Sequence, residues 1–255
     1  MTFADKTIIV TGATSGIGRA TAEAFGRERA VVVAVGREEG ALADVAENVR
    51  AAGGRAVICR ADITASEAAD RIVKAALDES GALDVLVNAA GVIASGTLDK
   101  TTDETWDSMM AVNVTAPFRL MRAAAPHLAA RKGTVVNVSS VNGLRSFPGV
   151  LAYCVSKAAM DQLTRCAAIE MAPIGVRVNA VNPGVTVTNL HRRSGMGEAQ
   201  YAAFLERSKE THPLGRPGRP EEIADVIVFL ASDRCGWMTG ETIPIDGGRH
   251  LTCAR

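Results

Sequence analysis

The sequence predicts an α/β fold in which one domain is built on a mainly parallel sheet. Short runs of β-branched residues alternate with helix-like stretches from one end of the chain to the other, which is typical of strand–helix–strand units. Several of these runs are apolar at every position, as expected of strands that are covered on both faces. The 255 residues contain no linker, internal repeat or low-complexity tract, so we expect a single domain over residues 1–255.

The composition argues against several classes of function. Lys plus Arg and Asp plus Glu each number 28, so the formal net charge is zero and neither nucleic acid nor an anionic membrane is indicated as a partner. Five cysteines without Cys-x-x-Cys spacing and four scattered histidines predict neither a disulfide framework nor a metal site. There is no signal-peptide pattern, and no uncharged apolar run approaches about 18 residues. We therefore expect a cytoplasmic protein without a membrane span.

The first unit is a strand at residues 7–10, followed by a glycine-rich turn and a helix from Arg19 to Arg29. Glycines let backbone N–H groups approach an anion, and a helix N-terminus adds partial positive charge, so this order is typical of phosphate binding. The glycine spacing is one residue longer than the common dinucleotide pattern. The predicted phosphate loop contains Gly12, Thr14, Ser15, Gly16, Ile17 and Gly18.

The second strand, residues 31–35, ends where a dinucleotide fold meets the adenosine ribose. Gly36 stands where an acid would bind the 2′-hydroxyl, and Arg37 follows it. Because a guanidinium matches phosphate oxygens, Arg37 favours NADP over NAD, although a solvated surface arginine is the alternative. After a helix at residues 38–52 and a strand at residues 55–59, Asp62 and Ile63 reach the adenine end. Asp62 accepts from the adenine amino group, caps a helix beginning near Ala65, or does both.

The fourth strand, residues 83–87, ends in the small residues Asn88, Ala89, Ala90 and Gly91, which permit close approach of a cofactor. A long helix, capped by Thr102 or Asp103, then runs to about Arg131. Asn113 lies on its apolar side, where an amide is unfavourable unless it is hydrogen-bonded. Either a buried polar contact or a functional role would explain an asparagine at this position.

The fifth strand, residues 133–138, ends at Ser139 and Ser140, at the sheet edge where open α/β sheets bind ligands. Tyr153 begins a helix to Ala172, and Lys157 lies one turn later on the same face. A neighbouring ammonium favours the phenolate, so we expect a lowered pKa for Tyr153. An amphipathic pair with a solvated lysine is the alternative.

The last third of the chain holds the sixth strand at residues 175–181 and the seventh at residues 242–245, with a helix at residues 220–232 between them. Residues 185–219 are polar and irregular in sequence, and we expect a substrate lid there. The tail at residues 249–255 is expected to pack against a neighbouring subunit.

In order and spacing these motifs resemble the compact, roughly 250-residue branch of the short-chain dehydrogenase/reductase family, close to 3-oxoacyl-carrier-protein reductases. The resemblance covers essentially the whole chain. It implies a single Rossmann-type doubly wound parallel sheet with strand order 3-2-1-4-5-6-7 and helices on both faces. The sequence departs from the family pattern at two positions. Ala89 stands where a second Asn is common, and Ser15 stands where NADP-dependent members often carry a basic residue. Arg37 is then nearly the only residue that indicates NADP.

The resemblance also implies a function, the transfer of a hydride between NADP, with NAD possible, and a carbonyl or secondary alcohol. Tyr153 is the implied general acid/base, Ser140 the oxyanion donor, Lys157 the ribose-binding residue that lowers the Tyr153 pKa, and Asn113 the holder of a relay water. The family spacing selects Ser140 over Ser139. The further implied cofactor-binding residues are Pro183, Gly184, Val185 and Thr188, with Thr188 on the nicotinamide carboxamide.

The resemblance leaves the substrate open and implies a homotetramer. The expected pocket lining is Val92, Ile93, Asn142, Leu144, Val150 and Gly184. One alternative is an NAD-dependent sugar, polyol or steroid alcohol dehydrogenase. Another is a nucleotide-sensing regulator without turnover, but such a protein is expected to lose Tyr153 or Lys157, and both are present.

Overall fold

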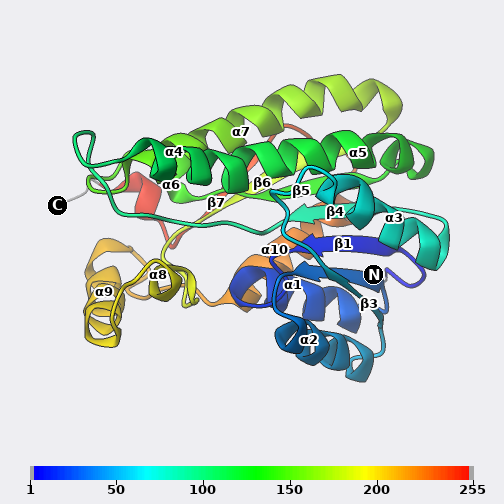
Figure 1. The fold of residues 1–255 in the computed structure, drawn as a ribbon, viewed down its shortest axis with the longest axis horizontal. Coiled ribbons are helices and arrows are strands. Elements are labelled where there is room, and N and C mark those ends of the chain that lie inside the picture. The colour runs from blue at the N-terminus through cyan, green and yellow to red at the C-terminus, as the bar shows by residue number, and fades with distance from the viewer. Residues whose placement is uncertain (1–2, 253–255) are drawn as a thin grey trace.

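The computed structural model describes residues 3–252 and arranges seven strands in one parallel sheet (Figure 1). The strand order is β3-β2-β1-β4-β5-β6-β7, which confirms the predicted topology. The strands are β1 (Thr7–Thr11), β2 (Val31–Gly36), β3 (Arg55–Arg60), β4 (Val85–Asn88), β5 (Thr134–Val138), β6 (Arg177–Pro183) and β7 (Thr242–Ile245).

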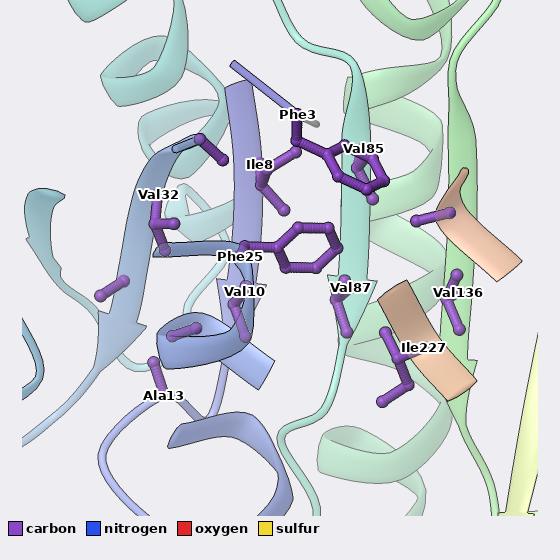
Figure 2. Close-up of a cluster of buried hydrophobic side chains, with 14 of the residues drawn as sticks. Phe3, Ile8, Val10, Ala13, Phe25, Val32, Val85, Val87, Val136 and Ile227 are labelled. Carbon is purple, nitrogen blue, oxygen red and sulfur yellow. The ribbon is translucent and has the colours of Figure 1, made fainter. Parts of the chain in front are cut away.

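Helices cover both faces of the sheet, and alternate strand residues bury against each layer. In β1, Ile8 and Val10 face one hydrophobic cluster and Ile9 faces the other, because successive side chains of a strand point to opposite faces. Figure 2 shows Phe25 and Ile227 packed over the first of these faces. That layer consists of α1 (Gly16–Arg27), α2 (Glu39–Ala51) and α10 (Pro220–Ala231). The opposite layer consists of α3 (Ala68–Ser80), α5 (Ala116–Arg131) and α7 (Leu151–Met171).

Several helix boundaries differ from the predicted ones. Helix α1 begins at Gly16 rather than Arg19, so the predicted phosphate loop includes the first turn of the helix. Helix α3 begins at Ala68 rather than near Ala65, because the Asp62 carboxylate accepts hydrogen bonds from the N–H and the hydroxyl of Thr64 and forms a separate turn. Asp62 therefore does not cap α3.

The predicted long helix is α4 (Asp103–Met110), a π-helical turn at Ala111–Thr115, and α5 in succession. Thr102 caps α4, since its hydroxyl accepts from the N–H of Thr105 at 3.2 Å. The π turn places an extra residue inside the helix, and such turns are frequent at functional sites.

No helix was predicted between residues 185 and 219, where the sequence is polar and irregular. This segment contains α8 (Leu190–Arg193) and α9 (Glu198–Thr211), and a further short helix, α6 (Val141–Leu144), follows β5. Helix α9 buries only Tyr201 and Ser208, so its sequence has little helical periodicity of apolar residues.

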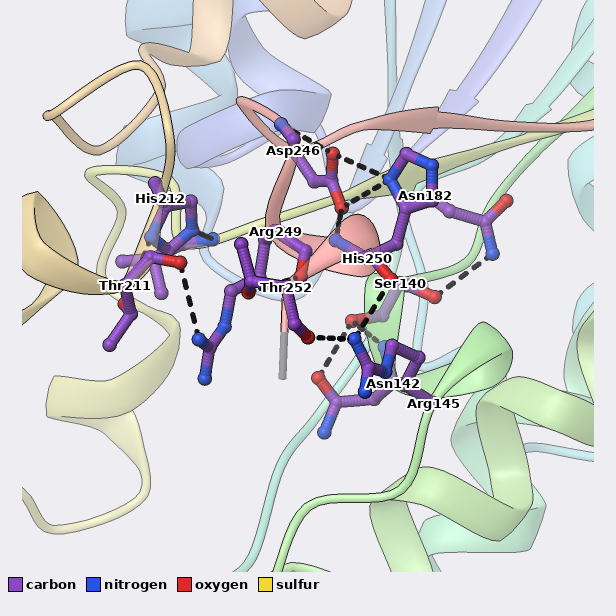
Figure 3. A network of polar contacts seen from close by, with 12 residues as sticks. Ser140, Asn142, Arg145, Asn182, Thr211, His212, Asp246, Arg249, His250 and Thr252 are labelled. Carbon is purple, nitrogen blue, oxygen red and sulfur yellow. Dashed lines mark hydrogen bonds and ion pairs between the residues drawn. The ribbon is translucent and has the colours of Figure 1, made fainter. Parts of the chain in front are cut away.

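The described part of the tail packs on its own chain. Arg145 donates a hydrogen bond to the carbonyl of His250 at 2.9 Å and another to the carbonyl of Thr252 (Figure 3). Residues 253–255 of the predicted tail contact lie outside the described residues, and packing against a neighbouring subunit stays a prediction. None of the helices within residues 3–252 is long and apolar enough to cross a membrane.

Candidate active site

The β1–α1 turn has the close backbone packing that an anion-binding loop requires. Gly12 has a φ of +67°, and a Cβ there would lie 2.8 Å from Cα of Ala90. A Cβ at Gly18 would lie 2.3 Å from the carbonyl oxygen of Gly12. Ser15 precedes α1 without a side-chain cap, which leaves the first N–H groups of the helix for another acceptor. A solvent-open hollow of about 500 Å³ faces this helix start; it is lined by Gly16, Arg19, Ala20, Glu23, Val187, Thr188, Asn189, Pro220 and Glu221.

The end of β4 is tied to this loop. The hydroxyl of Thr11 accepts hydrogen bonds from the N–H groups of Ala89 and Ala90, at 3.0 and 3.1 Å. Asn88 is buried and donates to the side-chain oxygen of Asn137 at 2.8 Å. The predicted residues 88–91 and 12–18 therefore form one continuous surface at the carboxyl ends of β1 and β4.

At the predicted adenosine end, Gly36 leaves no room for the acidic residue found in some dinucleotide folds. A Cβ there would lie 2.5 Å from Cγ2 of Thr14. Arg37 is exposed, and Arg60, which the sequence analysis missed, donates to its carbonyl oxygen at 3.2 Å. The hydrogen bonds from Thr64 lower the pKa of Asp62, and the charge of Arg37 lowers it further, so Arg37 and Asp62 lie near each other. Ile63 is partly buried against the core.

Three of the four predicted catalytic residues meet at the carboxyl end of β5. Tyr153 and Lys157 are buried on α7, with only 6% and 4% of their surface exposed. The Ser140 side chain lies close enough to the Tyr153 hydroxyl to lower its pKa. The Lys157 ammonium donates to the carbonyl of Val138 at 2.8 Å and lies 5.8 Å from the centroid of the Tyr153 ring. The predicted proximity of this pair is therefore present.

The expectation that Lys157 lowers the Tyr153 pKa is wrong for the chain alone. Burial raises the pKa of Tyr153 to about 12, and this outweighs the opposing effect of Ser140. Burial also lowers the pKa of Lys157 to about 8, although the charge of Asp161 raises it. Both groups are desolvated, and desolvation disfavours the charged form of each. Tyr153 is therefore protonated at neutral pH.

Asn113 is fully buried within the π turn, and its amide serves the neighbouring loop. Its side-chain oxygen accepts from the N–H of Val92 at 3.0 Å, and its NH₂ donates to the carbonyl of Val92 and to the hydroxyl of Ser156, each at 3.0 Å. These contacts explain how an amide is accommodated in an apolar helix face. The side chain lies beside Lys157, since a Cβ at Gly91 would lie 3.4 Å from Oδ1 of Asn113 and 3.6 Å from Nζ of Lys157.

Within residues 185–219, two side chains that the sequence analysis missed hold the remaining predicted residues in place. The hydroxyl of Tyr201 donates to the carbonyl of Thr188 at 2.9 Å and accepts from its N–H at 3.1 Å. Nε2 of His212 accepts from the N–H of Val185 at 3.2 Å. A Cβ at Gly184, which follows Pro183, would lie 3.0 Å from the same nitrogen.

An apolar cluster packs with Tyr153 and includes Val92, Ile93 and Val150 of the expected lining, whose contact with substrate stays a prediction. Met109 and Ala152 bury against the Tyr153 ring, and Asn142 instead binds the Ser140 hydroxyl. Leu144 is 38% exposed. The partly buried members of the cluster are Val92, Ile93, Ala94, Trp106 and Val150.

Comparisons with known proteins agree with this arrangement. A family model described as enoyl-(acyl carrier protein) reductase matches residues 12–250. An uncharacterized oxidoreductase of Thermotoga maritima is 38% identical over 249 residues, covering 97% of this chain and 98% of its own. A protein named 3beta-hydroxysteroid dehydrogenase 1, from Eggerthella lenta, is 38% identical over 253 residues, covering 96% and 94%.

A solved structure gives the same result for the fold. The crystal structure of a short-chain dehydrogenase/reductase of unknown function from Caenorhabditis elegans, with cofactor, has a TM-score of 0.92 and 35% sequence identity. The match covers 99% of this chain and 97% of the nematode chain. With its sheet order, strand-end site and relatives of nearly equal length, the chain belongs to the short-chain dehydrogenase/reductase family of oxidoreductases.

Proposed function

We propose that this protein transfers a hydride between NADP and a carbonyl or secondary alcohol, with Tyr153 as the general acid/base. One observation carries the proposal. The Ser140 side chain lies close enough to the Tyr153 hydroxyl to lower its pKa, and the Lys157 ammonium is buried beside the Tyr153 ring. This group lies at the carboxyl edge of the sheet, where α/β folds bind their ligands.

The residues present fit a nicotinamide dinucleotide. The β1–α1 turn accepts no Cβ at Gly12 or Gly18, and its uncapped helix start suits a diphosphate. Lys157 would hold the nicotinamide ribose hydroxyls, and Thr188 the carboxamide. When bound, the nicotinamide supplies or accepts the hydride. The exposed Arg37, together with a Gly36 that leaves no room for an acid, favours a 2′-phosphate and therefore NADP.

The roles of the side chains follow from their protonation and contacts. Tyr153, which keeps its proton at neutral pH, donates it to the carbonyl oxygen of the substrate in the direction of reduction. Ser140 donates a second hydrogen bond to the developing oxyanion, and removing one such donor costs on the order of 10²–10³ in rate. Asn113 fixes the loop at Val92 and belongs to a proton relay from Lys157 to solvent.

An NAD-dependent steroid alcohol dehydrogenase is the second candidate. The relative from Eggerthella lenta is named 3beta-hydroxysteroid dehydrogenase 1, and the apolar cluster around Tyr153 suits a large apolar alcohol. A cytoplasmic location rests on the composition alone. The family resemblance supports a homotetramer.

Tyr153→Phe tests the proposal. The phenylalanine keeps the ring and its packing but has no proton to give, so turnover with NADPH should fall by on the order of 10²–10⁴-fold. Binding of NADPH, measured by its fluorescence, should stay within about twofold of the unmodified protein. Unchanged carbonyl reduction in this variant would refute the assignment of Tyr153. A wild-type protein that binds NADPH but reduces no member of a carbonyl panel would instead favour a nucleotide-sensing regulator.

A further inference from the structure

Asp161 is a buried ionisable group that the proposed chemistry does not use. It lies on α7 one turn beyond Lys157, and only 1% of its surface is exposed. Tyr153, Lys157 and Asp161 are spaced four residues apart and therefore lie along one face of the helix. A carboxylate in such a place is unfavourable unless other groups hydrogen-bond it, so its contacts indicate what it does.

Asp161 is joined to the backbone of Ser140 through one amide. Nδ2 of Asn182, at the end of β6, donates to Oδ1 and Oδ2 of Asp161 at 3.1 and 2.9 Å. The same Nδ2 donates to the carbonyl oxygen of Ser140 at 2.9 Å, a contact drawn in Figure 3. Asn182 has no exposed surface, so water does not compete for these bonds.

The carboxylate also touches the segment on either side of Ser140. The Ser139 hydroxyl donates to the carbonyl of Lys157 at 3.1 Å and lies close enough to Asp161 to lower the pKa of that carboxyl group. On the other side, a Cβ at Gly143 would lie 2.3 Å from Oδ2 of Asp161, so α6 approaches the carboxylate closely. The segment from residue 139 to residue 143 therefore meets Asp161 on both sides of Ser140.

We propose that Asp161 is a positioning residue, which through Asn182 and Ser139 fixes the Ser140 hydroxyl relative to Tyr153. The inference rests on the proposed function, because it assigns Asp161 to the geometry of that reaction. Asp161 is not proposed to touch substrate or cofactor. Its contacts are with Asn182, which binds the Ser140 carbonyl, and with Ser139 and Gly143 on either side of Ser140.

The charges around Asp161 add a second effect. Burial raises the pKa of Asp161, while the neighbouring Ser139, the hydrogen bonds from Asn182 and then the charges of Arg165 and Lys157 lower it. The titratable groups among these, Lys157 and Arg165, are both on α7, and the groups that face Asp161 from β5, α6 and β6 are not ionisable. Asp161 in turn raises the pKa of Lys157. Removing the carboxylate should therefore move the alkaline limb of the pH–rate profile to lower pH.

Asp161→Asn and Asp161→Ala test the proposal, with the exposed Glu170→Gln of the same helix as control. Asparagine keeps the volume and one acceptor oxygen; alanine keeps neither. A small displacement of reacting groups lowers rates by on the order of 10²-fold, so kcat should fall by about that factor in the alanine variant and less in the asparagine variant. The KM for NADPH should stay within about twofold, the alkaline limb should move in both variants, and Glu170→Gln should behave as wild type.

Hydrogen exchange keeps this test independent of the proposed function. Amides of residues 139–145 should exchange faster in Asp161→Asn than in wild type, and amides of the β1–α1 turn should not. Unchanged exchange in residues 139–145 would overturn the inference, and so would an unchanged kcat in an active enzyme. A wild type without turnover on any carbonyl would refute the proposed function, and exchange would still decide the role of Asp161. Equal loss of kcat, NADPH affinity and thermal stability in the isosteric asparagine variant would also overturn it, because that pattern indicates a merely structural residue.

Discussion

The buried ammonium of Lys157 predicts an unusual pH dependence of stability. Burial lowers its pKa from 10.5 to about 8 in the folded chain, so between these values the unfolded chain binds more protons. The free energy of unfolding should therefore rise as the pH increases from about 8 towards 10.5. A drop in pKa of this size corresponds to roughly 3 kcal/mol, which is the cost of keeping the ammonium charged in the folded protein at neutral pH.

Lys157→Met removes that cost and keeps most of the apolar stem. It also removes the hydrogen bond to the carbonyl of Val138, worth about 1 kcal/mol, so at pH 7 the variant should be more stable than wild type by roughly 2 kcal/mol. The difference should shrink steadily towards pH 10. The raised pKa of Tyr153 does not affect stability between pH 7 and pH 10. It acts between pH 10 and about 12, where the free energy of unfolding should fall because Tyr153 ionises in the unfolded chain at a lower pH than in the folded one.

Urea unfolding of the cofactor-free protein at a fixed concentration, from pH 7 to pH 10, measures the effect. The control is Lys100→Met, which removes an exposed lysine and should show no pH-dependent difference from wild type. A difference between wild type and Lys157→Met that stays constant across this range would refute the argument, because the lysine would then titrate alike in the folded and unfolded chains.

Two further predictions concern the cofactor. Arg37→Ala should raise the Kd of NADPH about tenfold and leave that of NADH within about twofold, since a hydrogen bond to a charged group contributes roughly 1.5–3 kcal/mol. Equal weakening of NADPH and NADH binding would count against NADP, and so would the same effect in the exposed control Arg50→Ala. Gly18→Ala should weaken binding of both cofactors tenfold or more, because its Cβ would lie 2.3 Å from the Gly12 carbonyl. Fluorescence titration measures each, and Gly40→Ala, whose Cβ meets nothing within 4 Å, should leave affinity unchanged.

The sheet was predictable because its strands carry their own signal. Runs that are apolar at every position, as at residues 31–35, specify burial on both faces, and the family resemblance implied the strand order. Helix starts were less predictable, because side-chain bonds set them. The turn formed by Asp62 and Thr64 moves the start of α3 to Ala68. In the sequence, an acidic residue that caps a helix cannot be told from one that forms a separate turn before it.

Helix α9 was missed for a different reason. It packs on the rest of the protein through few residues, so a charged sequence with two buried positions has almost no hydrophobic periodicity. The contact between Tyr201 and Thr188 is likewise invisible in the sequence, because the two residues are brought together only by the return of α9 towards β6.

Helical spacing predicted that Tyr153 and Lys157 are neighbours, but it carried no information about burial, and burial decides their protonation. At neutral pH, a tyrosine whose pKa is about 12 keeps its proton and a lysine whose pKa is about 8 is still mostly charged, so the chain alone holds its acid ready to donate. Donation is the role required for carbonyl reduction. Action as a base in alcohol oxidation requires a positive charge near the phenol that outweighs desolvation, and full protonation of Lys157 provides one. The carboxylate of Asp161 raises the Lys157 pKa and so favours that protonation, which gives this buried group influence over both directions of the reaction.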